Sequence, residues 1–110
     1  MVQGHIRGLS LYYADGVERM EIWINKKKAY PLPFKLGIRV PIRLRVGAHV
    51  YHAGLRSTEN NDYVWICSDL IDDKGKKARL TKVLQKNSFN KNNVICLSIE
   101  KDIISISRVQ

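Results

Sequence analysis

The segment IRVPIRLRVG, residues 38–47, constrains the fold more than any other part of the sequence. Aliphatic residues occupy every second position from Ile38 to Val46, and arginines stand between them at positions 39, 43 and 45. This alternation predicts a β-strand with its apolar face in a core and its arginine face in solvent. Pro41 shares the arginine side. Because proline cannot donate a ladder hydrogen bond, it predicts an edge or a bulge.

The remaining sequence predicts more short strands and one helix. Strand-forming segments lie at residues 5–13, 20–25, 48–56 and 63–70, and two further strands flank a tight turn at residues 100–102. Residues 78–89 carry apolar side chains at helical spacing and form the only good helical stretch. We therefore expect a mostly-β barrel or sandwich, folded as a single domain over residues 1–110.

Positive charge is concentrated in one third of the chain. The formal charge is +9, from 19 basic and 10 acidic residues, and no acidic residue occurs from Ile22 to Thr58. A fold that brings this segment to one side has a positive face suited to a polyanion. The alternative is charge scattered for solubility. The basic residues of the segment are Lys26, Lys27, Lys28, Lys35, Arg39, Arg43, Arg45 and Arg56.

A polar tip, RSTENND, separates two of the predicted strands. Its side chains suit DNA, because arginine pairs with guanine, asparagine pairs with adenine, and hydroxyl groups bind backbone or bases. A two-stranded tip is narrow enough for the major groove. The alternative is a plain hairpin turn. The candidate contacts here are Arg56, Ser57, Thr58, Asn60, Asn61 and Tyr63.

The sequence offers little for catalysis or for cofactors. It contains no phosphate-binding glycine loop and no nucleophile elbow, and the basic third has no carboxylate to hold a metal. Cys67 and Cys96 lack metal-ligand spacing and are interpreted as buried, reduced thiols. We expect no enzyme activity, no metal, no cofactor and no small-molecule substrate.

No apolar run approaches the length of a membrane span, and the N-terminus does not resemble a signal peptide. We therefore expect a cytoplasmic protein without a membrane partner, associated with the nucleoid if it binds DNA. Trp23 and Trp65 lie within strand patterns and are interpreted as core residues. Exposed aromatics would instead favour single strands or RNA.

The run from Arg43 to Phe89 resembles the plant B-three transcription-factor domain and the DNA-binding pseudobarrel effector domains of some restriction endonucleases. The resemblance rests on Leu55-Arg56, Asn60-Asn61, Tyr63-Val64 and the segment FNKNNV that follows the predicted helix. It implies a seven-stranded open pseudobarrel with one or two short helices. It also implies two arms that grip the major groove, at residues 56–63 and at about Asn25 to Gly37. The sequence departs from the plant pattern in leaving no room for a helix before the arginine-bearing strand.

These observations lead to one functional hypothesis and two alternatives. The hypothesis is a non-catalytic domain that binds double-stranded DNA with its two arms, the basic residues setting affinity and the polar tip setting sequence preference. One alternative is a β-barrel that binds RNA or single strands. The other is a protein-interaction adaptor. The oligomeric state stays open.

Overall fold

The computed structural model describes residues 1–109, and most of them lie in strands. The elements are β1 (Val2–Tyr12), β2 (Glu18–Asn25), the 3-10 turn η1 (Lys26–Lys28), β3 (Val40–Val46), β4 (His49–Ser57), β5 (Tyr63–Ile66), β6 (Asp69–Ile71), β7 (Lys77–Arg79), α1 (Leu80–Lys86), β8 (Val94–Glu100) and β9 (Ile103–Arg108).

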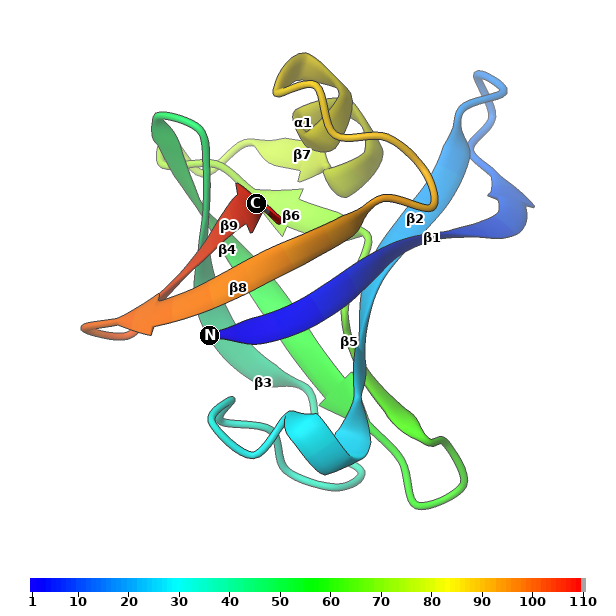
Figure 1. Cartoon of the computed structure of the whole chain (residues 1–110). Helices are drawn as coiled ribbons and strands as arrows, with labels where there is room; N and C mark the ends of the chain where they lie inside the picture. Colours follow the sequence, from blue (N-terminus) through cyan, green and yellow to red (C-terminus); the bar gives the residue numbers. More distant parts are fainter. Residues whose placement is uncertain (110) are drawn as a thin grey trace.

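Seven of these strands form a closed ring (Figure 1). The order around the ring is β3, β9, β8, β1, β2, β5 and β4, and β4 pairs again with β3. All neighbours are antiparallel except β3 and β9, which are parallel at residues 43–45 and 103–105. Strands β6 and β7 continue from β4 outside the ring. The predicted mostly-β, seven-stranded fold with a short helix is confirmed, but the pairing of β3 with β4 closes the ring that was expected to be open.

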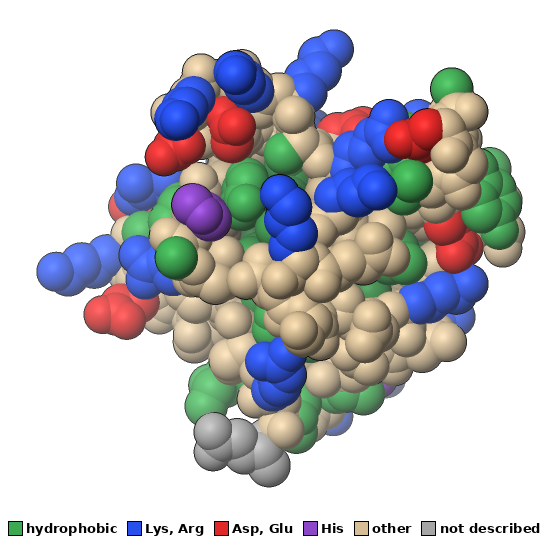
Figure 2. Space-filling view, turned by 90° about the horizontal axis from the view of Figure 1, so that it is seen from above, with side chains coloured by type: hydrophobic (Ala, Val, Ile, Leu, Met, Phe, Trp, Pro, Cys, Tyr) green, Lys and Arg blue, Asp and Glu red, His purple; other side chains and the backbone are tan. Residues whose placement is uncertain are grey.

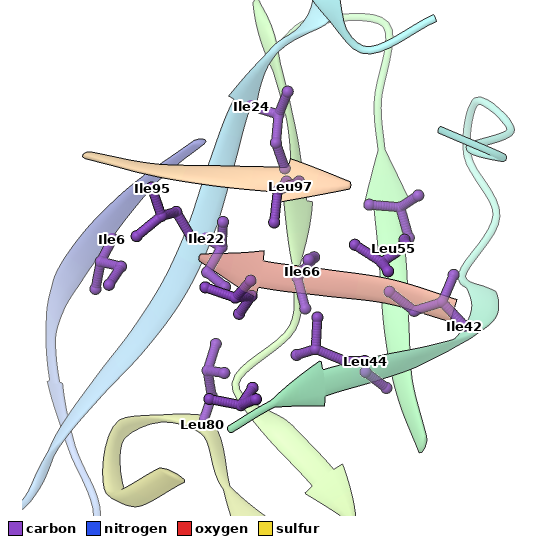
Figure 3. Packing of buried hydrophobic residues seen from close by; sticks show 14 of the residues in the cluster. Ile6, Ile22, Ile24, Ile42, Leu44, Leu55, Ile66, Leu80, Ile95 and Leu97 are labelled. Atoms are coloured by element: carbon purple, nitrogen blue, oxygen red, sulfur yellow. The ribbon is translucent and has the colours of Figure 1, made fainter. Parts of the chain in front are cut away.

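The barrel interior follows from the alternation of the strands. Ile42, Leu44 and Val46 point into the core, whereas the arginines at positions 43 and 45 are exposed, as the sequence predicts. Isoleucines and leucines from every side of the ring meet in the middle (Figure 3). Burial of this apolar surface is the main force that holds the strands together.

Helix α1 covers one end of the barrel with Leu80 and Leu84, which are fully buried. The helix is shorter than the predicted 78–89. Residues 77–79 pair with β6 as strand β7, and the Leu80 amide donates to the carbonyl of Ser68. At the other end Ser88 takes a positive φ of 63°, and the Phe89 amide donates to the carbonyl of Leu84, which stops the helix.

Two predicted strands also have different bounds. The strand expected from residue 38 begins at Val40, because Ile38 belongs to a turn and is 54% exposed. The strand expected at 63–70 breaks after Ile66, where the Cys67 amide donates to the carbonyl of Gly54 and the chain bends away toward β6. Pro41 lies outside the part of β3 that pairs with β9.

Both cysteines, Cys67 and Cys96, are free and half-buried. Within residues 1–109, no helix is both long enough and apolar enough to cross a bilayer.

Candidate nucleic-acid interface

Two segments that are distant in sequence lie at the same end of the barrel (Figure 1). The first arm comprises residues 26–39, which connect β2 to β3 and begin with η1. The second arm comprises residues 56–63, which connect β4 to β5. Because β2 and β4 both pair with β5, their neighbouring ends bring the two arms together. The predicted pair of arms therefore occupies one end of the molecule.

Hydrogen bonds tie the arms to one another. The Lys26 amide donates to the Asp62 carbonyl at 2.8 Å, and the Gly37 amide donates to the Ser57 carbonyl at 2.9 Å. The Lys26 ammonium group also donates to the Thr58 carbonyl. These bonds link both ends of the first arm to the second arm, so the arms form one connected surface.

Several predicted contact residues point outward from this surface. Six of their side chains are exposed, and they carry either a positive charge or an amide: Lys27, Lys28, Lys35, Arg39, Arg56 and Asn60. Four others are half-buried: Lys26, Thr58, Asn61 and Tyr63.

Ser57 has a different place from the one predicted. Its side chain is only 2% exposed, and its hydroxyl donates to the Lys35 carbonyl at 3.1 Å. The residue therefore joins the arms and does not face a ligand. Sequence reasoning assigned it to the exposed tip because its hydrogen-bond partner lies 22 positions away in the chain.

Arg43 and Arg45 also lie apart from the arms. Both are exposed on β3, where Arg43 stands opposite His52 and Arg45 stands opposite Val50. Val50 precedes Arg56 by six positions on one extended strand, which is about 20 Å at 3.3 Å per residue. A ligand held by both arms therefore reaches Arg45 only if it also extends along the outside of the barrel.

The arms carry an uncompensated positive charge. They contain six basic and two acidic side chains, which leaves a formal charge of +4. Within residues 1–109, both ion pairs lie elsewhere, between Arg79 and Asp15 and between Lys91 and Glu18. Within the same described residues, the two carboxylates of the arms, Glu59 and Asp62, form no ion pair with the basic groups there.

Arg39 lies flat against β4 at the base of the arms. Its guanidinium group occupies the space that a Cβ at Gly54 would need, so a glycine there permits this close approach. Burial raises the pKa of the neighbouring Cys67 thiol, and the charges of Arg39 and Arg56 partly oppose this rise. Arg39 is close to Cys67 because it lies against Gly54, whose carbonyl accepts a hydrogen bond from the Cys67 amide.

An aromatic cluster beside the arms corrects one prediction. Trp23 and Trp65 are not core residues; they are half-buried on the outside of β2 and β5, where they stand opposite each other. The rings of Trp23 and Tyr63 are stacked with their centroids 3.8 Å apart, and Trp65 is tilted 5.7 Å from Tyr63. The alternation along each strand could have predicted the outward position of both tryptophans, because the buried isoleucines of both strands occupy the other face.

The cluster supports the second arm. Tyr63 is the last residue of that arm, and its stack on Trp23 fixes it against β2. Arg7 lies over the Trp23 ring at 5.0 Å, and the Trp23 indole donates to the Glu21 carboxylate at 2.9 Å. Burial raises the pKa of Glu21, and the indole hydrogen bond acts in the opposite direction.

The opposite end of the barrel also carries charged side chains, and it is hollowed by a groove. Figure 2 looks down on the α1 end and shows acidic side chains beside several of the basic ones. A groove of about 830 Å³ lies there between the β3–β4 turn, the β6–β7 turn and α1, and its lining mixes lysines with Asp72 and Asp73. The lining carries five lysine or arginine side chains against these two aspartates, so this end of the barrel is basic as well.

Comparisons with known proteins gave no match: none with a protein-family model, none with a curated protein and none with a solved structure. Across residues 1–109, no three His, Cys, Asp or Glu side chains are grouped so that they could hold a metal ion.

Proposed function

We propose that this barrel binds double-stranded DNA with its two arms. The observation that carries the proposal is that the arms adjoin and bear a net positive charge without ion pairs. Such a surface attracts the phosphate backbone, while narrow loops can enter a groove. The resemblance to DNA-binding pseudobarrels supports the same partner.

The arms divide the task between affinity and sequence preference. The exposed lysines of the first arm neutralise phosphates, which fixes the position of the duplex without reading its sequence. Arg56 and Asn60 in the second arm are exposed and have the side chains that pair with guanine and adenine. Arg39, beside the base of the second arm, supplies a further phosphate contact.

The test is a backbone NMR titration with a random-sequence duplex at low salt, followed by affinity measurements at rising salt. We expect shifts confined to residues 26–39 and 56–66, and a log–log salt slope of about −0.9 per phosphate contact. Chemical-shift changes confined to the α1 end, or an affinity that does not change with salt concentration, would contradict the proposal. Capture of a protein partner without affinity for nucleic acid would support the adaptor alternative.

A second candidate function is the binding of single strands across the outer face of β2 and β5. The outward position of Trp23, Tyr63 and Trp65 favours it, because bases stack on aromatic rings. Trp23 already contacts Tyr63 and Arg7, which leaves less of its ring for a base. Stronger quenching of tryptophan fluorescence by oligo-uridine than by a duplex would favour this candidate over the first.

A further inference from the structure

The first arm exposes apolar side chains among its basic ones. Tyr30 is 83% exposed, Leu36 is 51% exposed and Ile38 is 54% exposed. Single exposed apolar residues are ordinary on protein surfaces. Here three of them share one connection with four lysines and with Arg39, and the barrel leaves all three uncovered.

A tight turn places Leu36 at the surface of the first arm. Residues 35–38 form this turn, in which the Ile38 amide donates to the Lys35 carbonyl at 3.2 Å. Gly37 has a φ of +76°, which a turn with a left-handed third residue requires. The leucine is therefore the second residue of the turn, with its side chain directed away from the turn's own hydrogen bond.

Both neighbours of Leu36 are anchored to the second arm. The Gly37 amide donates to the Ser57 carbonyl, and the Ser57 hydroxyl donates to the Lys35 carbonyl. Because Ser57 is buried, these bonds are shielded from water. These bonds fix the backbone of the turn, which keeps the half-exposed leucine next to cationic groups.

We propose that Leu36 is an apolar wedge that pushes between base pairs of the bound duplex, and this inference rests on the proposed function. Proteins that kink DNA insert apolar side chains between base steps while cations hold the flanking phosphates. Leu36 has Lys35 beside it and Arg39 three positions on. The first arm therefore has both an apolar side chain to insert and cations to hold the flanking phosphates.

The neighbouring arm favours a duplex over a lipid surface. Exposed apolar and basic side chains also bind anionic bilayers. The second arm, however, is polar from Arg56 to Asp62 and carries two carboxylates, at Glu59 and Asp62. It lies at the same end as Leu36 and offers no apolar side chain to enter a bilayer with it. Polar side chains suited to base edges, beside the few exposed apolar side chains of the first arm, match a deformed duplex.

The experiment compares a fully paired 20-base-pair duplex with the same duplex carrying a central T·T mismatch. A mismatched step is easier to unstack, so a wedge binds it more tightly. We expect the wild-type chain to prefer the mismatched duplex by about tenfold. Leu36→Ser should abolish the preference, so that the variant binds the paired and the mismatched duplex equally tightly.

Leu11→Ser is the matched control. Leu11 is 60% exposed, but it lies in β1 near the hairpin with β2, at the other end of the barrel. We expect this variant to keep the full preference. Both substitutions replace an exposed leucine, so neither should affect folding.

The remaining outcomes overturn either the wedge alone or the wedge together with the proposed function. Paired-duplex binding without a mismatch preference, or a preference that survives Leu36→Ser, overturns the wedge and leaves the proposed function standing. Absence of duplex binding overturns both. Binding to vesicles of phosphatidylserine and phosphatidylcholine that Leu36→Ser abolishes, without duplex binding, assigns the leucine to a lipid surface instead.

Discussion

The hydroxyl of Ser57 donates a hydrogen bond of 3.1 Å to the carbonyl of Lys35 and thereby joins the two arms. Ser57→Ala removes this bond, and we expect a loss of about 1 kcal/mol in the free energy of unfolding. Urea denaturation measures the loss. The Gly37 amide, which donates to the Ser57 carbonyl, should also exchange faster with solvent, because the first arm is less firmly held.

The control for this variant is Ser107→Ala on β9, where the serine is exposed. It should leave the unfolding midpoint and the Gly37 exchange rate nearly unchanged. Equal losses in both variants would mean that the Ser57 hydrogen bond contributes nothing specific to the arms.

Arg56 and Arg45 should differ in their effect on DNA affinity, because about 20 Å of strand β4 separates their positions. We expect Arg56→Ala to weaken binding by about 1–3 kcal/mol if the guanidinium contacts a base. If it contacts a phosphate, the salt slope should fall by about one. Fluorescence anisotropy on several duplex sequences separates these cases, since a base contact weakens only some of them.

Arg45→Ala removes the same charge from a site away from the arms and serves as the control. Its affinity should stay within a factor of about three of wild type at moderate salt. A loss equal to that of Arg56→Ala would place the duplex along the outside of β3 as well.

Glu21 should make the stability of the barrel depend on pH. Burial raises the pKa of its carboxyl group, so the folded chain binds the proton more tightly than the unfolded chain does. The stabilisation is therefore complete below the ordinary glutamate pKa of about 4.3 and is lost as the pH rises through the raised value. Glu21→Gln should raise the melting temperature at pH 7, and the difference should vanish near pH 4.

Glu100→Gln, at the exposed turn between β8 and β9, is the comparison for charge alone. It should have little effect at either pH. A lower melting temperature for Glu21→Gln at pH 7 would mean that the hydrogen bond from Trp23 outweighs the cost of burial.

The stack of Tyr63 on Trp23 should be measurable in the tryptophan emission. Tyr63→Ala uncovers one face of the Trp23 ring, so we expect the emission to shift to longer wavelength. We also expect a loss of at least about 0.5–1.5 kcal/mol in stability. Tyr30→Ala is the control, because this tyrosine is 83% exposed in the first arm. Unchanged emission in Tyr63→Ala would argue against the stack.

The sequence predicted the parts of the fold that depend on local alternation. The faces of β3 followed from the spacing of Ile42, Leu44 and Val46, and the final hairpin followed from the polar turn at residues 100–102. The parallel pairing of β3 with β9 was not predicted, because the paired residues lie sixty positions apart and nothing in the sequence of either strand identifies the other as its neighbour.

The candidate site was also predicted only in part, because some of its contacts join residues that are far apart in the sequence. The charge gap between Ile22 and Thr58 is visible in the sequence and covers the first arm, whereas the pair of arms was implied by the resemblance to DNA-binding pseudobarrels. The burial of Ser57 and the tie between the arms depend on contacts across 22 residues. The outward position of Trp23 was missed because its place within a strand pattern was interpreted as burial, although the alternation with Ile22 and Ile24 placed it on the other face.

The parallel contact between β3 and β9 also fixes when the barrel can be completed during synthesis. A ribosome releases residues 26–63, with both arms, long before residues 103–108 emerge. Until then β3 lacks one neighbour, and the edges of β3 and β8 are open to pairing with other chains. A nascent or truncated chain without β9 would thus expose two strand edges that can pair with other chains, which makes β9 a determinant of aggregation as well as of stability.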